Sequence, residues 1–92
     1  MIYRRAERFR KAFKALPRAV QEKVVKAFAL FQQDQRHPSL LIKKMQGHAG
    51  IWEGRIDQDY RFTFHYEKGR VPDEIVCVFR NVDSHDECLK NP

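Results

Sequence analysis

The chain has 92 residues, 42% of them hydrophobic and 12% aromatic, so it can fold as one compact domain over residues 1–92 and has no room for a second core. Eighteen Lys and Arg against 12 Asp and Glu give a net charge of +6, which favours polyanionic partners such as nucleic acid, although a solvated basic surface gives the same count. No apolar run approaches the roughly 20 residues that cross a bilayer, and the N-terminus MIYRRAERFR lacks a hydrophobic signal region. We therefore expect a cytoplasmic protein with no membrane partner, whose two cysteines, Cys77 and Cys88, are reduced.

The first half of the chain is predicted to form a helical hairpin. Residues 5–16 and a second segment running toward Gln35 carry apolar residues at helical spacing. These residues are Ala6, Phe9, Phe13 and Leu16 in the first helix, and Val20, Val24, Phe28 and Phe31 in the second. Pro17 can end the first helix and begin the second, and Pro38 closes the helical half because the residue before a proline is pushed into extended geometry.

After Ser39 the pattern changes to short β-like runs separated by turn residues. The runs are LLIKKM (40–45), IWEGRI (51–56), YRFTFHY (60–66) and EIVCVFRNV (74–82). A final helical turn is predicted with Ser84 as its N-cap and Glu87 as the capping-box partner. The sequence thus predicts an α+β fold in which an N-terminal helical hairpin packs on an antiparallel sheet of three or four strands, followed by a short C-terminal helical turn.

Alternation along the run YRFTFHY separates two faces of the predicted sheet. The core face, taken to pack on the helices, carries Tyr60, Phe62, Phe64 and Tyr66. The other face carries Arg61, and the same alternation on neighbouring strands places Arg55 and Arg80 there, so three arginines are predicted to converge close to His85. Arginine on a rigid strand suits bidentate contacts with phosphate. Lys43 and Lys44 are adjacent and point to opposite faces, so only one of them can join this surface directly.

The runs HPSLLIKKMQG, IWEGRIDQDYRFTF and FRNVDSHDE resemble the RelE/ParE superfamily of toxins from type II toxin-antitoxin systems, in the RelE- and YafQ-like branch. The similarity extends from about Glu7 to Leu89, and its most specific pieces are the spacing of Arg55, Asp59, Tyr60 and Arg61 and that of Arg80 and His85. The resemblance implies two helices packed on an antiparallel sheet. It also implies a metal-independent endonuclease without a cofactor, which cleaves mRNA on the ribosome, inhibits translation and is neutralised by a cognate antitoxin.

The resemblance also implies roles for individual residues. Arg61 and Arg80 would stabilise the negative charge of the phosphorane, and His85 would be the general acid or base. Asp59 matches an acidic position of the YafQ-like branch, and Arg55 stands where that branch has a histidine. Lys43 or Lys44 corresponds to a basic strand position at the phosphate. The C-terminal tyrosine of some members is missing, which puts extra weight on His85.

A further departure lies at the N-terminus, where family members carry an edge strand. Only MIY precedes Arg4, which predicts that this strand is shortened or missing. Such shortening would either expose a sheet edge for a partner or reflect a displaced start of the sequence.

Simpler roles compete with the functional ones. Asp59 is equally well explained as a residue that organises a turn, and His85 as a residue at the start of a helix. Glu53 is explained by a cross-strand pair with a neighbouring arginine, and Trp52 by packing in the core. His37, His48 and His65 are interpreted as surface or turn residues.

Two other functions remain open at this point. One is a non-catalytic ParE-like toxin that binds DNA gyrase, because fold similarity does not decide chemistry. The other is a stand-alone RNA-binding domain or an inactive relative, which the lack of a GXXG loop or an RNP-like motif disfavours.

Overall fold

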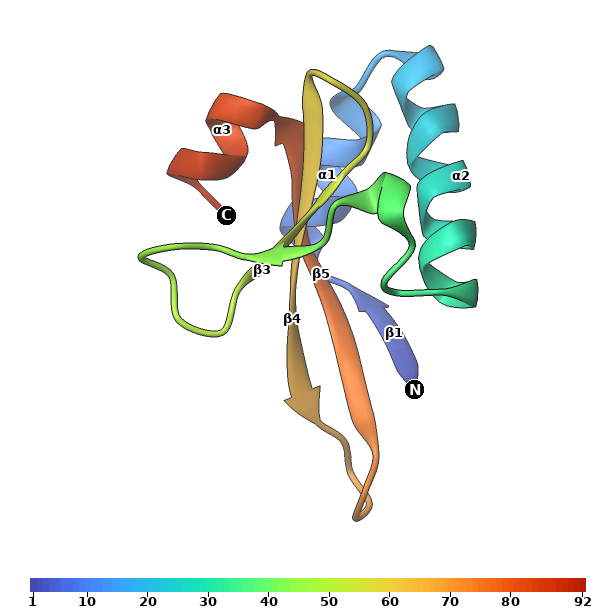
Figure 1. Ribbon diagram of the computed structural model, residues 1–92, viewed down its shortest axis with the longest axis vertical. Helices are drawn as coiled ribbons and strands as arrows, with labels where there is room; N and C mark the ends of the chain where they lie inside the picture. Colours follow the sequence, from blue (N-terminus) through green and yellow to red (C-terminus); the bar gives the residue numbers. More distant parts are fainter.

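The computed structural model describes residues 1–92 and has helices on both sides of one sheet. In chain order the elements are β1 (Ile2–Arg5), α1 (Glu7–Ala15), α2 (Arg18–Gln33), the 3-10 turn η1 (Pro38–Leu40), β2 (Lys43–Lys44), β3 (Trp52–Arg55), β4 (Tyr60–Lys68), β5 (Ile75–Ser84) and α3 (His85–Lys90). Figure 1 shows α2 on one side of the strands and α3 on the other. The predicted α+β class, with its helical hairpin and short C-terminal helix, is confirmed.

The sheet has five strands in the order β1-β5-β4-β3-β2 and is mixed, whereas the sequence predicts three or four antiparallel strands. The additional strand is β1, which pairs with β5 in parallel, Ile2 opposite Val76 and Arg5 opposite Phe79. The N-terminal strand predicted to be shortened or missing is therefore present with four residues, and Arg5 belongs to it instead of to the first helix. The Ala6 N–H donates to the carbonyl of Phe79 (2.9 Å), so the strand pairing continues up to the start of α1.

Proline and apolar spacing account for the helical hairpin. The Leu16 N–H donates to the carbonyl of Phe13 and closes α1, and Pro17 follows in extended geometry (φ −55°, ψ 147°) directly before α2. Helix α2 turns Val20, Val24, Ala27 and Phe31 into the core. These residues share one helical face because they recur at spacings of three and four.

The core between the helices and the sheet is built mainly from phenylalanine rings. Phe31 is fully buried, and its ring centroid lies 5.1 Å from Phe64, 5.8 Å from Phe79 and 5.9 Å from Phe62. The rings meet edge to face, an arrangement that adds to the stabilisation from buried area. Trp52 stacks on Phe64 at the margin of this cluster, which agrees with its predicted packing role.

A glycine on β3 lets the core close. Gly54 stands opposite Phe62 in the register of β3 and β4, and the Phe62 ring lies over the Gly54 backbone. A Cβ atom at position 54 would overlap this ring and would lie 2.8 Å from Ile42 Cδ1. Only glycine allows this close approach, as overpacking of a core is destabilising.

The outer face of the sheet is partly covered by α3 and the residues after it. Ser84 caps α3 as predicted, because its Oγ accepts a hydrogen bond from the Glu87 N–H (3.3 Å). Asn81 donates to the carbonyl of Asn91 (2.9 Å), and so does Arg8 from α1. The rest of the outer face, beside β2 and β3, stays open, and the candidate site lies there.

Both cysteines are free and buried, in agreement with the predicted reduced state. Burial raises the pKa of Cys77 to about 12 and that of Cys88 to about 11. The thiols therefore stay protonated near neutral pH and are poor nucleophiles. None of the three helices has the length and apolar character needed to cross a membrane.

Candidate functional site

Two arginines stand directly opposite each other on the outer face of the sheet. Arg55 ends β3 and pairs in register with Arg61 on β4, and both line one cavity of about 380 Å³. Neither guanidinium forms an ion pair with a carboxylate. Like charges at directly opposed cross-strand positions are destabilising, so this pair carries an electrostatic cost that a bound anion would relieve.

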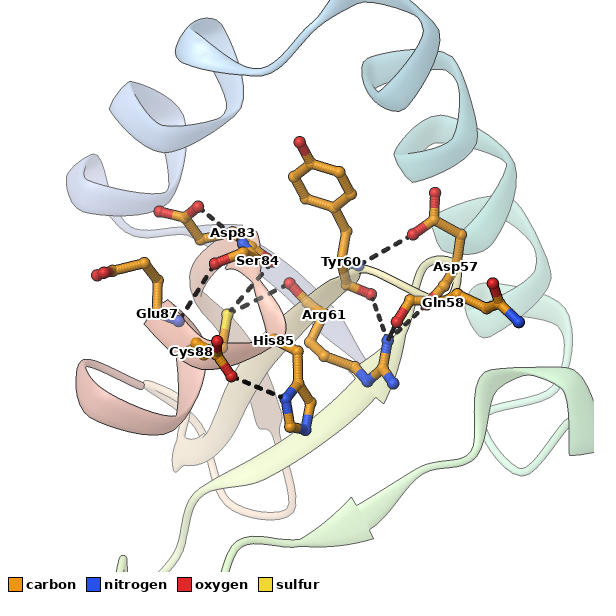
Figure 2. A network of polar contacts seen from close by, with 10 residues as sticks. Asp57, Gln58, Tyr60, Arg61, Asp83, Ser84, His85, Glu87 and Cys88 are labelled. Atoms are coloured by element: carbon orange, nitrogen blue, oxygen red, sulfur yellow. Dashed lines mark hydrogen bonds and ion pairs between the residues drawn. The ribbon is translucent and has the colours of Figure 1, made fainter.

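Arg61 is held in place by the backbone of the β3–β4 turn. Its Nη1 donates to the carbonyls of Asp57, Gln58 (3.3 Å) and Tyr60 (3.0 Å), as Figure 2 shows. These acceptors are neutral, so the guanidinium keeps its full charge while its orientation is restricted. A preorganised cation of this kind stabilises developing negative charge without a large cost of reorientation.

His85 is the first residue of α3, next to the end of β5. Its backbone N–H donates to the carbonyl of Asp59 (2.8 Å), which ties the start of α3 to the β3–β4 turn. The side chain is about half exposed, with its Nδ1 3.4 Å from a carboxylate oxygen of Asp86. Figure 2 shows the imidazole and the Arg61 side chain extending to the same side of β4, and both line the 380 Å³ cavity together with Arg55.

Lys43 and Lys44 have different surroundings, and only Lys43 lies beside the two arginines. Lys43 lines the cavity of Arg55, Arg61 and His85, and its Nζ lies 3.3 Å from a carboxylate oxygen of Glu53. Lys44 Nζ instead lies 5.3 Å from the centre of the Trp52 ring, a cation–π contact. Both lysines and His85 also line a second cavity of about 320 Å³. Lys43 is therefore the lysine that faces the two arginines.

Arg80 lies on the same face but apart from His85. The pairing of β4 with β5 shifts register between Thr63 and Phe64, which leaves Arg80 as the extra residue of a β-bulge. Its Nη1 contacts His65 Nδ1 (2.9 Å) and its Nε donates to the carbonyl of Pro92 (3.2 Å). Arg80 lines none of the three cavities that His85 lines, so two arginines converge at the histidine where the sequence predicts three.

His65 is engaged on both ring nitrogens. Nε2 lies 2.9 Å from a carboxylate oxygen of Glu67, and Nδ1 faces the Arg80 guanidinium, which can only donate. Nδ1 is therefore the acceptor in the contact with Arg80, and the contact with Glu67 is made by Nε2. Both ring nitrogens are therefore occupied, and His65 helps to orient Arg80, whereas the sequence suggests a surface or turn residue; its side chain is only 21% exposed.

The β3–β4 turn is organised by the carboxylate of Asp57, a residue for which the sequence predicts no role. Asp57 Oδ1 accepts from the N–H groups of Asp59 (2.8 Å) and Tyr60 (2.9 Å), and Oδ2 is 3.0 Å from Lys23 Nζ on α2. Asp59 contributes its carbonyl to His85, while its exposed side chain lines a third cavity with Arg61 and His85. An Asp side chain that accepts hydrogen bonds from the N–H groups two and three residues later is a common feature of turns. In the stretch IDQDY this residue is Asp57.

The pKa of Asp57 is lowered from its ordinary value of 3.8. Burial alone would raise this pKa, but the hydrogen bonds from Lys23 and from the N–H groups of Asp59 and Tyr60 outweigh that effect. The charged carboxylate is thus favoured in the folded state, and its contribution to stability is present above the unfolded pKa and is lost as the pH falls through the folded pKa.

Replacing Asp57 with asparagine is expected to lower the free energy of unfolding by about 1–2 kcal/mol at pH 7, because charge-assisted hydrogen bonds are weakened. Urea unfolding at pH 7 and near pH 3 measures the effect, and the difference from the wild-type protein is expected to shrink at the lower pH. Glu22→Gln removes an exposed carboxylate on α2 and is the matched control. An unchanged difference at both pH values would contradict this assignment.

No group of three or more His, Cys, Asp or Glu side chains lies at a spacing that would hold a metal ion. The side chains gathered at the site are instead cationic, apart from Glu53 and the acidic residues at the turn and the start of α3. The arrangement can bind an anion between Arg55, Arg61 and Lys43 and can exchange a proton at His85.

This architecture is that of the RelE, YafQ and ParE class of toxins. A YoeB/ParE toxin from Agrobacterium tumefaciens superposes with a TM-score of 0.71 at 15% identity, over 92% of this chain and 99% of that one. YafQ from E. coli strain BL21(DE3) gives 0.71 at 11% identity, over 94% of each chain. In the RelB-RelE antitoxin-toxin complex from Methanococcus jannaschii the matching chain gives 0.66 at 20% identity, over 98% of this chain and 96% of that one.

The family model for phage-derived Gp49-like proteins matches residues 11–79, well over half of the chain. The protein belongs to this Gp49-like family, a RelE-like toxin family, which confirms the resemblance seen in the sequence. No curated protein sequence matches the chain significantly.

Proposed function

We propose that this protein is the toxin of a type II toxin-antitoxin system and acts as an endonuclease that cleaves mRNA on the ribosome, inhibiting translation in the cytoplasm. The observation that carries the proposal is the opposed pair Arg55 and Arg61, which lacks carboxylate partners and shares a cavity with His85. A phosphodiester between the two guanidinium groups would relieve their repulsion. It would also lie within the cavity that the His85 imidazole lines.

The chemistry follows from the charges in the cavity. Attack of a ribose 2′-hydroxyl on the adjacent phosphorus adds negative charge to the phosphate oxygens, and Arg61, Arg55 and Lys43 supply cations where that charge develops. His85 in its protonated form donates a proton to the departing 5′-oxygen. The products are a 2′,3′-cyclic phosphate and a 5′-hydroxyl end.

Residues outside the cavity have supporting roles in this proposal. Asp59 holds the start of α3, and thereby His85, through its carbonyl. Arg80 lies farther along the face, where it would contact a neighbouring phosphate of the same strand.

A cognate antitoxin is the second partner we propose. The net charge of +6 calls for an acidic protein segment, and the RelB-RelE antitoxin-toxin complex is a structure of the same fold. Coverage of the Arg55–Arg61 cavity by such a segment would block access of RNA.

The experiment that tests the proposed function uses purified protein in a reconstituted translation reaction. Cleavage of mRNA that depends on ribosomes and leaves a 2′,3′-cyclic phosphate is the expected result. Intact mRNA together with inhibited supercoiling in a parallel DNA gyrase assay would contradict the nuclease and support the ParE-like alternative.

A further inference from the structure

One acidic side chain lies among the cations of the candidate site and is not used by the proposed chemistry. Glu53 is on the outer face of β3, only 5% exposed, and lines both cavities that Lys43 and His85 share. The sequence suggests a cross-strand pair with an arginine, but the only ion pair of Glu53 is with Lys43 at 3.3 Å. A carboxylate at this position repels phosphate, so its presence opposes binding of RNA and needs another explanation.

The contact with Lys43 is a weak reason to bury this carboxylate. The Lys43 side chain is 70% exposed, and an ion pair with such a flexible, solvated partner contributes little. The ion pair with Lys43 is the only polar contact of the Glu53 side chain, whereas buried carboxylates are ordinarily well hydrogen-bonded.

A buried polar group without any partner lies beside it. Thr63 stands opposite Glu53 in the register of β3 and β4, is fully buried, and its Oγ1 has no hydrogen-bond partner. The Thr63 hydroxyl therefore leaves unused hydrogen-bonding capacity next to Glu53, the residue of this cross-strand pair that lines the cavities with His85. A buried polar group left without a partner in a folded protein calls for an explanation, and a binding or catalytic role is one such explanation.

We propose that Glu53 accepts the proton of the attacking ribose 2′-hydroxyl. This role rests on the proposed function. The 2′-O–H bond breaks and its proton passes to a carboxylate oxygen of Glu53, while the new 2′-O–P bond forms. The P–O5′ bond breaks, and the 5′-oxygen takes a proton from the His85 imidazolium. Afterwards Glu53 releases its proton to water and His85 takes one up, so both residues return to their starting states.

The charged and titratable groups that face Glu53 are compatible with Glu53 acting as the base and His85 as the acid. Lys43 comes from β2, Arg61 from β4, and His85 and Cys88 from α3, where the Glu53 charge helps to raise the pKa of the Cys88 thiol. Lys43 and the arginines are the cations that line the cavity beside the Glu53 carboxylate, whose ionised form is the one that accepts a proton. The histidine on the other side supplies the acid, so base and acid are separate groups.

The test compares Glu53→Gln, which keeps the shape and loses the charge, with Lys43→Gln, which removes the ion pair but keeps the carboxylate. Glu53→Gln is expected to lower kcat on the order of 100-fold or more while KM for ribosome-bound mRNA stays equal or falls. Lys43→Gln is expected to lower kcat by a clearly smaller factor, because it removes one of three cations and leaves the proton acceptor in place. Binding of a 2′-deoxy mRNA analogue, which cannot react, and thermal unfolding show that each variant is folded.

The pH profile separates a proton acceptor from a structural carboxylate. The wild-type rate is expected to fall on the acid side as the base is protonated and on the alkaline side as His85 loses its proton. Glu53→Gln should lose the acid-side fall, and Glu53→Asp should restore part of it. A wild-type kcat in Glu53→Gln, or equal losses of kcat and of stability in Glu53→Gln and Lys43→Gln, would overturn this role and leave the nuclease intact. A wild-type protein that does not cleave would overturn both.

Discussion

An Arg61→Ala variant is expected to cleave mRNA on the order of 100-fold or more slowly than the wild-type protein, because one cation of the transition-state site is removed. Arg61 lies opposite Arg55, and its guanidinium is oriented by turn carbonyls, so no neighbouring side chain can replace its charge at the same place. The rate is measured by primer extension on ribosome-bound mRNA. The loss is expected mainly in kcat, since the interaction strengthens as charge develops on the phosphate.

Two variants control for loss of structure and for loss of charge alone. Arg70→Ala removes an exposed arginine on the far β4–β5 hairpin and is expected to cleave like the wild-type protein. Arg61→Lys keeps the charge but loses the planar fork, and is expected to recover only part of the rate. Full cleavage by Arg61→Ala, with unchanged product ends, would contradict the proposed phosphate site.

A Phe31→Ala variant is expected to lose about 3–5 kcal/mol of its free energy of unfolding. Phe31 has no exposed surface, and its ring contacts three phenylalanines of β4 and β5 and Tyr3 of β1, so alanine leaves a cavity where α2 meets the sheet. A domain of this size has a total stability of about 5–15 kcal/mol, so much of it is removed. Urea unfolding followed by circular dichroism gives the value.

The matched control for that variant lies on the same helix. Val25 is 61% exposed on α2, and Val25→Ala is expected to change stability by less than about 0.5 kcal/mol. A loss below about 1 kcal/mol in Phe31→Ala would show that the site collapses around the smaller side chain and that the ring cluster is not the main support of α2.

The sequence predicts the fold well where the hydrophobic pattern of a segment matches the period of the helix or strand that it forms. Alternation in YRFTFHY correctly identifies Phe62 and Phe64 as core residues of β4, because every second residue of a strand points to the same face. Tyr66, predicted on the same face, is 38% exposed because it lies beyond the ring cluster. The segment IYRR of β1 has no such alternation, since it is an edge strand with a mostly exposed surface. Its partner β5 is distant in sequence, so local reasoning could only suggest that the strand is short or absent.

The candidate site is predicted in part for the same reason. Arg55 and Arg61 come together because regular pairing preserves alternation. Arg80 does not join them, because a β-bulge adds one residue to β5. The residue pattern does not predict this bulge. Asp57 and Asp59 are chemically alike and two residues apart, so only the turn's backbone decides which carboxylate accepts the hydrogen bonds.

The position of β5 in the sheet constrains how the chain reaches its folded state. This strand, the last to be synthesised, lies between β1, the first, and β4. The N-terminal segment therefore has no strand to pair with until residues 75–84 have been made, and the loop closed by that pairing spans most of the chain. Contacts between residues so far apart in the sequence slow folding. Phe9 of α1 and Phe31 of α2 also cannot pack against Phe79 until β5 has been made. A nascent chain that ends before β5 cannot assemble the core or bring His85 to Arg61, so the candidate site forms only after residues 75–85 have been made.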